Sequence, residues 1–212
     1  LVCWQDNGTA MWGVEAIMLS AGTNVEWLRD DLGLIPDAAS SAKIAATVDS
    51  TEGVVYVPAL LGLGTPHWDY GARGALLGLT RGSTAAHIVR AVLEGVAERG
   101  ADLVESAEID CKLQFSSLRV DGGMAANPVF VQALANAVQK PVEVAPVTEA
   151  TALGAGFLAG LAVGIWNSWD EIADTWQPAF AVEPGAPTDR DRWKDAVSRA
   201  SEWYGDLSAL DF

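Results

Sequence analysis

The sequence predicts an α/β fold, and three features of it point there. Residues 118–166 pass from a short β-type run through a glycine turn into a helical run, and the same order of strand and helix then repeats. Residues 87–107 carry apolar side chains along one face of a long helix. Half of the 212 residues are hydrophobic, so the chain is able to fill a substantial core between layers of strands and helices.

Charge and cysteine content limit the classes of partner. The formal net charge is −15 and the isoelectric point is about 4.3, so nucleic acids and anionic membrane surfaces would repel the chain at long range. Cys3 and Cys111 lie far apart without the spacing of a zinc site, which favours a reducing compartment, and we expect a cytoplasmic protein. Residues 1–8 show no signal-peptide pattern, and we expect them to lie inside a longer polypeptide.

The first elements are expected to be a hairpin and a helix. Residues 1–4 and 9–14 flank Asn7-Gly8, a pair that favours a tight two-residue turn between antiparallel strands. Residues 17–32 place apolar side chains on or near one face, which predicts a helix ending at Gly33. A connector with a short helix at residues 42–48 follows.

A β-rich run at residues 53–58 leads into a segment rich in glycine and proline, residues 58–82. Long irregular segments inside compact domains often carry function, so this loop is a second candidate site. His67 and His87 are the only histidines, and neither has a carboxylate or histidine four residues away. We therefore interpret both as surface or packing side chains rather than as metal ligands or general bases.

The long helix at residues 87–107 is expected to act as scaffold. Its apolar stripe is expected to face a core, and charged side chains line its other side. Arg90 and Glu94 are placed for an i,i+4 ion pair, which adds little when exposed. The polar side comprises Arg90, Glu94, Glu98, Asp102 and Glu105.

The most informative stretch is the turn that follows the strand predicted at residues 117–120. Gly122 and Gly123 leave main chain bare, and Asn127 before Pro128 is a strong helix-start signal. A bare turn lets a flat or charged ligand reach backbone N–H groups, and a helix N-terminus suits phosphate, so the pattern describes a nucleotide-sized site. A purely structural turn and cap is the alternative, and Asp121 is interpreted as a turn residue rather than a base.

The next strand is predicted at residues 141–145, and Thr148 is the expected cap of the last apolar helix, with Glu149 at the positive end of its dipole. Residues 150–166 invite comparison with a membrane span, because glycines recur there every four residues. Such glycines equally let a helix lie close to a sheet, and a membrane-associated protein is kept only as the weakest alternative. A polar segment with a helix at residues 191–205 follows as a C-terminal arm or cap.

Together, these stretches resemble the C-terminal domain of the FGGY carbohydrate kinases, and among the members of that family they most resemble the glycerol kinases. The resemblance covers about residues 10–170. Residues 74–79, GALLGL, followed by HIVRAVLE at residues 87–94, fit a family signature. The other matching blocks are residues 14–34, 57–82, 118–127 and 147–166.

The resemblance implies an actin-like ATPase (ribonuclease H-like) fold, a five-stranded mixed sheet flanked by helices and incomplete at its N-terminus. It implies a kinase domain at residues 1–170 and a helical arm or cap at residues 171–212. By the same resemblance, Gly82, Gly122, Gly123 and Asn127 would contact the nucleotide, with ATP and Mg²⁺ as cofactors. The family places a polar residue four positions after Gly82, and Ala86 stands here, so this part of the comparison ends at Gly82.

The same resemblance places the catalytic Asp, a Thr-Gly phosphate turn and the substrate-binding residues upstream of Leu1. We therefore expect the full protein to convert ATP and glycerol into ADP and glycerol 3-phosphate, and this chain alone to be inactive. Phosphorylation of another polyol or sugar, such as xylulose, is the nearest alternative. An actin-like nucleotide-binding module without transferase activity is the next. No nucleic acid or membrane partner is expected, and a homo-oligomer stays open.

Overall fold

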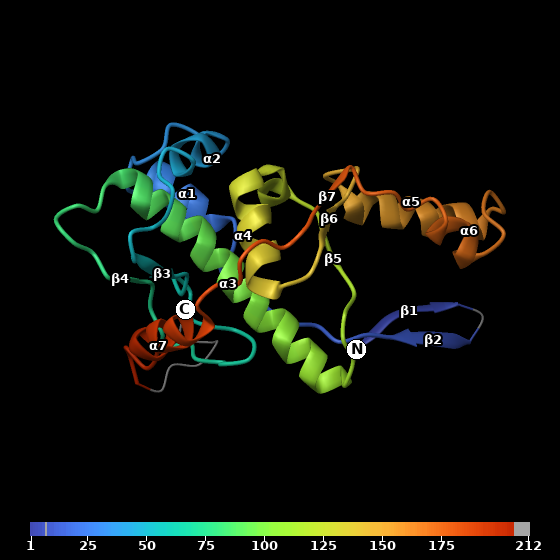
Figure 1. Cartoon of the computed structure of the whole chain (residues 1–212). Helices are drawn as coiled ribbons and strands as arrows, with labels where there is room; N and C mark the ends of the chain where they lie inside the picture. Colours follow the sequence, from blue (N-terminus) through green and yellow to red (C-terminus); the bar gives the residue numbers. More distant parts are fainter. Residues whose placement is uncertain (7, 206–212) are drawn as a thin grey trace.

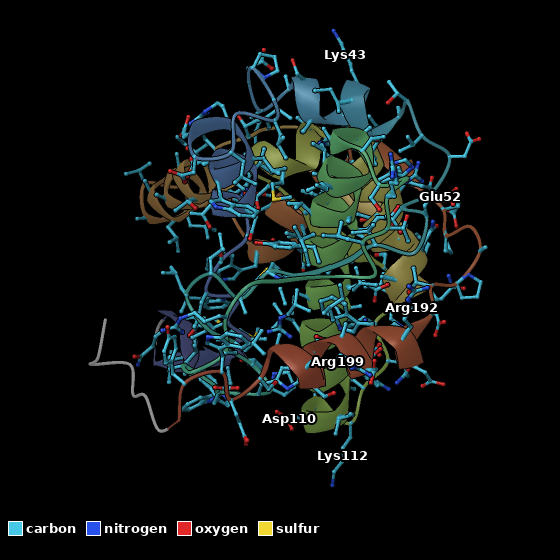
Figure 2. All side chains as sticks on the ribbon, turned by 90° about the vertical axis from the view of Figure 1, so that its left-hand side faces the viewer. Lys43, Glu52, Asp110, Lys112, Arg192 and Arg199 are labelled. Atoms are coloured by element: carbon cyan, nitrogen blue, oxygen red, sulfur yellow. The ribbon has the colours of Figure 1, made fainter. Side chains whose placement is uncertain are left out.

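The computed structural model describes residues 1–6 and 8–205, and Asn7 of the predicted hairpin turn lies outside these ranges. The long helix α3 (Ala85–Cys111) runs through the body, and α4 (Pro128–Val138) packs along it (Figure 1). Helices α1 (Thr23–Asp30) and α2 (Ser40–Ala45) lie against the N-terminal half of α3. In Figure 2, α3 runs the length of the body, with α2 at one end and Lys112 at the other.

The α/β class is confirmed, but the strands form three separate sheets. Strand β5 pairs with β6 in parallel and β6 pairs with β7 antiparallel, so this sheet is mixed as expected, and α4 covers one face of it. The expected single five-stranded sheet does not form among the described residues. No strand there pairs with both the first hairpin and β5, so the hairpin and the mixed sheet stay separate. The strands are β1 (Val2–Asp6) with β2 (Thr9–Trp12), β3 (Val55–Val57) with β4 (Ala75–Leu77), and β5 (Leu118–Val120) with β6 (Val142–Val144) and β7 (Phe180–Val182).

The helix predicted from residue 17 begins only at Thr23, as α1. Asn24 explains the delay, because its Nδ2 donates to the carbonyl oxygens of Ser20 (3.0 Å) and Ala21 (2.9 Å). These bonds hold the preceding residues in a turn. Asn24 is fully buried, and its Oδ1 accepts the hydroxyl of Tyr56 at 2.8 Å, so tertiary contacts override the helical pattern here.

The loop at residues 58–82 is less irregular than predicted. Residues 75–77 form β4, which pairs antiparallel with β3. Apolar residues of the loop, Leu63 and Ala72 among them, are buried in one cluster with α7 (Arg190–Ala200). The loop is therefore a packed layer between the body and the C-terminal helix.

Helix α3 confirms the predicted scaffold and extends it at both ends. It starts at a capping box between Thr84 and His87 and ends at Lys112, which has a left-handed backbone with φ of 53°. The charged side of α3 is not left to solvent at Asp102, because α7 covers it there and leaves Asp102 only 8% exposed.

The C-terminal part contains α5 (Ala150–Ala162), α6 (Trp169–Ala173) and α7. Thr148 does not cap α5: the N-cap is Glu149, whose side chain makes no capping bond. Among the described helices, none combines the length and the apolar character needed to cross a membrane. The segment expected to form a C-terminal arm or cap supplies β7 to the mixed sheet and packs α7 against β3.

Candidate functional site

The candidate site is built on the turn between β5 and α4. Gly122 has φ of 85° and ψ of −179°, a backbone conformation that essentially only glycine adopts. Residues Gly123–Ala126 then form a short 3-10 turn. A Cβ placed on Gly122 or on Gly123 would meet no atom within 4 Å, so the main chain of the turn is open to a ligand.

Asn127 confirms the predicted cap. Its Oδ1 accepts the backbone N–H groups of Val129 (3.0 Å) and Phe130 (3.1 Å), and Pro128 occupies the first helical position. Its Nδ2 donates to the hydroxyl of Ser41 at 3.0 Å. Among the described residues, the second Nδ2 hydrogen of Asn127 has no partner, so the amide is able to donate to a ligand while its oxygen is occupied.

The turn rests on the hydrophobic core. Met124, Val129 and Phe130 are half-buried against the cluster that contains Val25 of α1 and Ala45 of α2. These contacts tie the turn to α1 and α2. Bare peptide planes, one free amide hydrogen and a helix N-terminus suit a flat heterocycle with an anionic tail, and they supply no group that transfers protons.

Gly122, Gly123 and Asn127 belong to one turn, and Gly82 belongs to another. Gly82 lies in the exposed turn before α3, and its N–H donates to Thr80 Oγ1 at 3.2 Å. Within the described residues no bond joins Gly82 to the turn at Gly122. A role for Gly82 therefore stays a prediction of the family resemblance.

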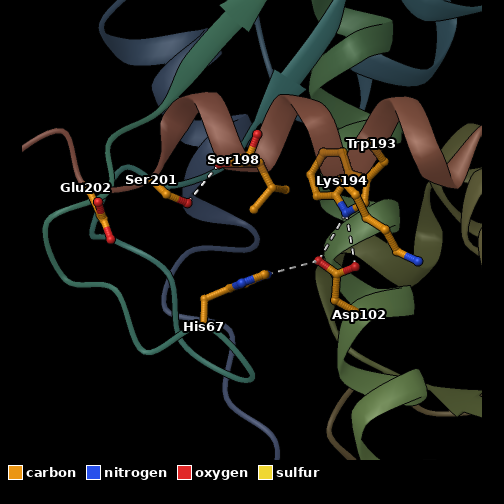
Figure 3. Close-up of a pocket in the computed structure, with 8 residues that line it drawn as sticks. His67, Asp102, Trp193, Lys194, Ser198, Ser201 and Glu202 are labelled. Atoms are coloured by element: carbon orange, nitrogen blue, oxygen red, sulfur yellow. Dashed lines mark hydrogen bonds and ion pairs between the residues drawn. The ribbon is translucent and has the colours of Figure 1, made fainter.

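A cavity of about 410 Å³ lies between α7, α3 and the loop that carries His67 (Figure 3). His67 faces Asp102 of α3, with 3.9 Å between Nε2 and Oδ2, which is too long for a hydrogen bond. Trp193 of α7 donates from Nε1 to both oxygens of Asp102, at 3.0 and 3.1 Å. Ser198 and Ser201 donate their hydroxyls back to carbonyl oxygens of α7. Nothing in this arrangement activates a nucleophile.

Asp102 is the electrostatic centre of that region. Arg99 Nη1 donates to it at 2.6 Å and Arg190 Nη2 at 2.5 Å. Burial alone raises the pKa of Asp102, but its contacts with His67, Arg99 and Arg190 outweigh burial and lower the pKa to about 2. Neighbouring Glu98 behaves differently, because burial raises its pKa despite its contact with Arg190.

The buried carboxylate therefore serves to tie α7 and the loop to α3. Arg99 also donates to the carbonyl oxygen of Thr65, at 2.7 Å, which extends the tie into the loop. Sequence reasoning missed this cluster. The signal was the i,i+3 pair of Arg99 and Asp102 on one helix, but periodicity cannot show which polar positions another helix will cover.

Comparison with known proteins identifies a family of similar sequences. The sequence profile for the C-terminal domain of the FGGY family of carbohydrate kinases matches residues 4–163. A glycerol kinase from Deinococcus radiodurans is 45% identical over 98% of the chain, and glycerol kinase 2 from Thermotoga maritima is 44% identical over 95% of it. The chain spans 42% of the length of each of these relatives.

Solved structures agree. The crystal structure of Plasmodium falciparum glycerol kinase with ADP superposes with a TM-score of 0.76 at 35% identity, covering 84% of this chain and 37% of that one. A xylulose kinase structure from Brucella ovis gives a TM-score of 0.72 at 26% identity, covering 87% of this chain and 38% of that one.

Proposed function

Because the chain belongs to the FGGY family of carbohydrate kinases, as their C-terminal domain, we propose that it is the ATP-binding lobe of an enzyme that phosphorylates glycerol. Glycerol is proposed as the substrate because the chain is 45% identical to a glycerol kinase over nearly its whole length. Nucleotide binding is proposed because the turn at Gly122 and Gly123 is open and lies beside a capped helix. The proposal includes an actin-like ATPase (ribonuclease H-like) fold and a cytoplasmic location, which two free cysteines favour.

The residues of this chain bind and orient rather than react. Gly122 and Gly123 receive the flat base against bare main chain, and Asn127 donates its free amide hydrogen to an acceptor of the nucleotide. Gly82 is proposed to approach the nucleotide from the loop before α3. ATP supplies the phosphoryl group, and positioning of its in-line transfer is the main task of a kinase.

The rest of the reaction needs groups outside this chain. The attacking hydroxyl of glycerol loses a proton, for which we propose a catalytic Asp upstream of Leu1. Mg²⁺ would enter with the phosphates of ATP. Within the described residues, no group of three or more His, Cys, Asp or Glu side chains could hold a metal ion.

The test compares two forms of the protein. At its natural length, with Mg²⁺, the protein should form ADP from ATP when glycerol is present, and this chain alone should give only background. Substantial turnover by this chain alone would contradict the proposal that the catalytic Asp lies outside it. Absence of turnover with glycerol by the protein at its natural length would contradict the proposed substrate.

Xylulose is the second candidate substrate, because a xylulose kinase structure superposes well on this chain. Its lower identity, 26% against 35% for the Plasmodium glycerol kinase, places it behind glycerol. Measuring kcat/KM for both substrates on one preparation decides between them.

A further inference from the structure

Ser41 is a buried hydroxyl at the back of the proposed nucleotide site. It lies in the first turn of α2 and is fully buried, 86 residues before Asn127 in the chain. Its hydroxyl donates to the carbonyl oxygen of Ala38 at 2.6 Å and accepts Nδ2 of Asn127 at 3.0 Å. The Ala38 bond orients the hydroxyl, so that a lone pair of Oγ faces the amide.

The bond from Asn127 to Ser41 is not itself part of the helix cap. Capping uses only Oδ1, which already accepts two backbone N–H groups of α4. The bond to Ser41 instead fixes the nitrogen end of the amide, and the amide plane with it. The second Nδ2 hydrogen then has one direction in space.

We propose that Ser41 is a positioning residue for nucleotide binding: it holds the amide of Asn127 so that the remaining Nδ2 hydrogen meets an acceptor atom of the nucleotide. This inference rests on the proposed function. It also specifies the chemistry, since an amide whose oxygen is saturated is able to donate but not to accept. Asn127 therefore recognises an acceptor, such as a purine ring nitrogen or a ribose oxygen, and no amino group.

The first test uses Ser41→Ala in the protein at its natural length, with Ser40→Ala as matched control. Ser40 lies one position away on α2, and its contacts are to Asp37. We expect Ser41→Ala to raise the KM for ATP about fivefold, the ratio that corresponds to about 1 kcal/mol for one ordinary hydrogen bond. The KM for glycerol should change less than about twofold, which a general loss of structure would not produce. Ser40→Ala should match the unmodified protein.

The second variant, Asn127→Asp, separates donation from capping. Aspartate caps helices as well as asparagine does, so α4 should keep its cap. The carboxylate has no hydrogen to donate, so the KM for ATP should rise at least tenfold. If Ser41→Ala does not fold, Ser41→Cys keeps the size of the side chain with a weaker acceptor and takes its place.

The outcomes separate this inference from the function on which it rests. An unmodified protein without saturable use of ATP would overturn the proposed function. An unmodified protein that saturates with ATP, together with a Ser41 variant whose KM for ATP equals that of Ser40→Ala, would overturn the role of Ser41. Unchanged ATP use by Asn127→Asp would overturn donation by the amide.

Discussion

Two neighbouring glycines at the candidate site are needed for different reasons. Gly122 has φ of 85° and ψ of −179°, so any side chain there strains the backbone although space is available. Gly123 has no such backbone constraint, and a Cβ on it would point into open space. The backbone conformation therefore requires glycine at position 122, whereas at position 123 we propose that glycine keeps the main chain accessible to the nucleotide.

Alanine substitutions should separate these roles. We expect Gly122→Ala to lower the free energy of unfolding by about 1–3 kcal/mol, the usual cost of a strained backbone. Gly123→Ala should leave it within about 0.5 kcal/mol. Because its methyl group would stand where the nucleotide is proposed to lie, Gly123→Ala should instead weaken ATP binding. Chemical denaturation and calorimetric titration measure the two effects, and unchanged ATP affinity in Gly123→Ala would place the nucleotide elsewhere.

At Asp102 the buried carboxylate gives a second residue-scale prediction. Asp102→Asn should lower the free energy of unfolding by about 3–5 kcal/mol, because Arg99 and Arg190 would stay buried beside a neutral amide. Asp195→Asn is the matched control. Its carboxylate pairs with Arg199 at the surface, where both side chains are more than half exposed, and we expect almost no change.

The pH dependence of stability follows from the same carboxylate. Its pKa in the folded chain is about 2, below its ordinary 3.8, so its contribution is present above pH 4 and is lost as pH falls through 2. Between these limits the unmodified chain should lose about 2 kcal/mol more than Asp102→Asn does. Parallel pH profiles of the two proteins in denaturant titrations would contradict the assignment.

At the scale of elements, the contact between α3 and β3 depends on Gly95 in the middle of the helix. Glycine inside a helix costs about 1 kcal/mol relative to alanine, so its presence needs a reason. A Cβ on Gly95 would overlap the backbone carbonyl oxygen of Tyr56 in β3. The helix thus lies directly on the backbone of the strand.

Gly95→Ala should therefore destabilise the protein by about 1–3 kcal/mol, although alanine favours helix, because α3 must move away from β3. The control is Gly156→Ala in α5, where a Cβ would meet no atom within 4 Å. That change should protect α5 by about 0.5–1 kcal/mol in amide hydrogen exchange. A stabilising effect of Gly95→Ala in thermal unfolding would show that the helix does not lie on the strand as closely as described.

On the scale of the whole molecule, the first hairpin and α5 expose unusual amounts of apolar surface. Both project from the same side of the body (Figure 1). Trp4 of β1 stacks on Trp169 of α6, with 4.2 Å between the ring centroids. Trp12 is 71% exposed, and Val163 at the end of α5 is 74% exposed. A helix as apolar as α5 is normally buried, so we expect this chain to self-associate when it is produced alone.

Charged side chains at these positions should suppress that association. In this chain alone, the double substitution Trp12→Arg and Val163→Arg should lower light scattering at a given concentration and leave the melting temperature unchanged, because both side chains are mostly exposed. Leu113→Arg, at another exposed apolar position just after α3, is the control and should scatter like the unmodified chain. If the double variant scatters as much light as the unmodified chain, the hairpin and α5 are not the surface through which the chain self-associates.

Local signals in the sequence determined the α/β class, the presence of the long helix α3 without its exact ends, the cap by Asn127 and the glycine turn, because each depends on residues within a few positions of one another. The tertiary structure alone decided the burial of Asp102 beneath α7, the strand within the 58–82 loop, the late start of α1 and the bond between Ser41 and Asn127. Each of these features depends on a contact between segments that are remote in the sequence. A helical or β-type pattern shows which face of an element is apolar, but not which element will cover the other face.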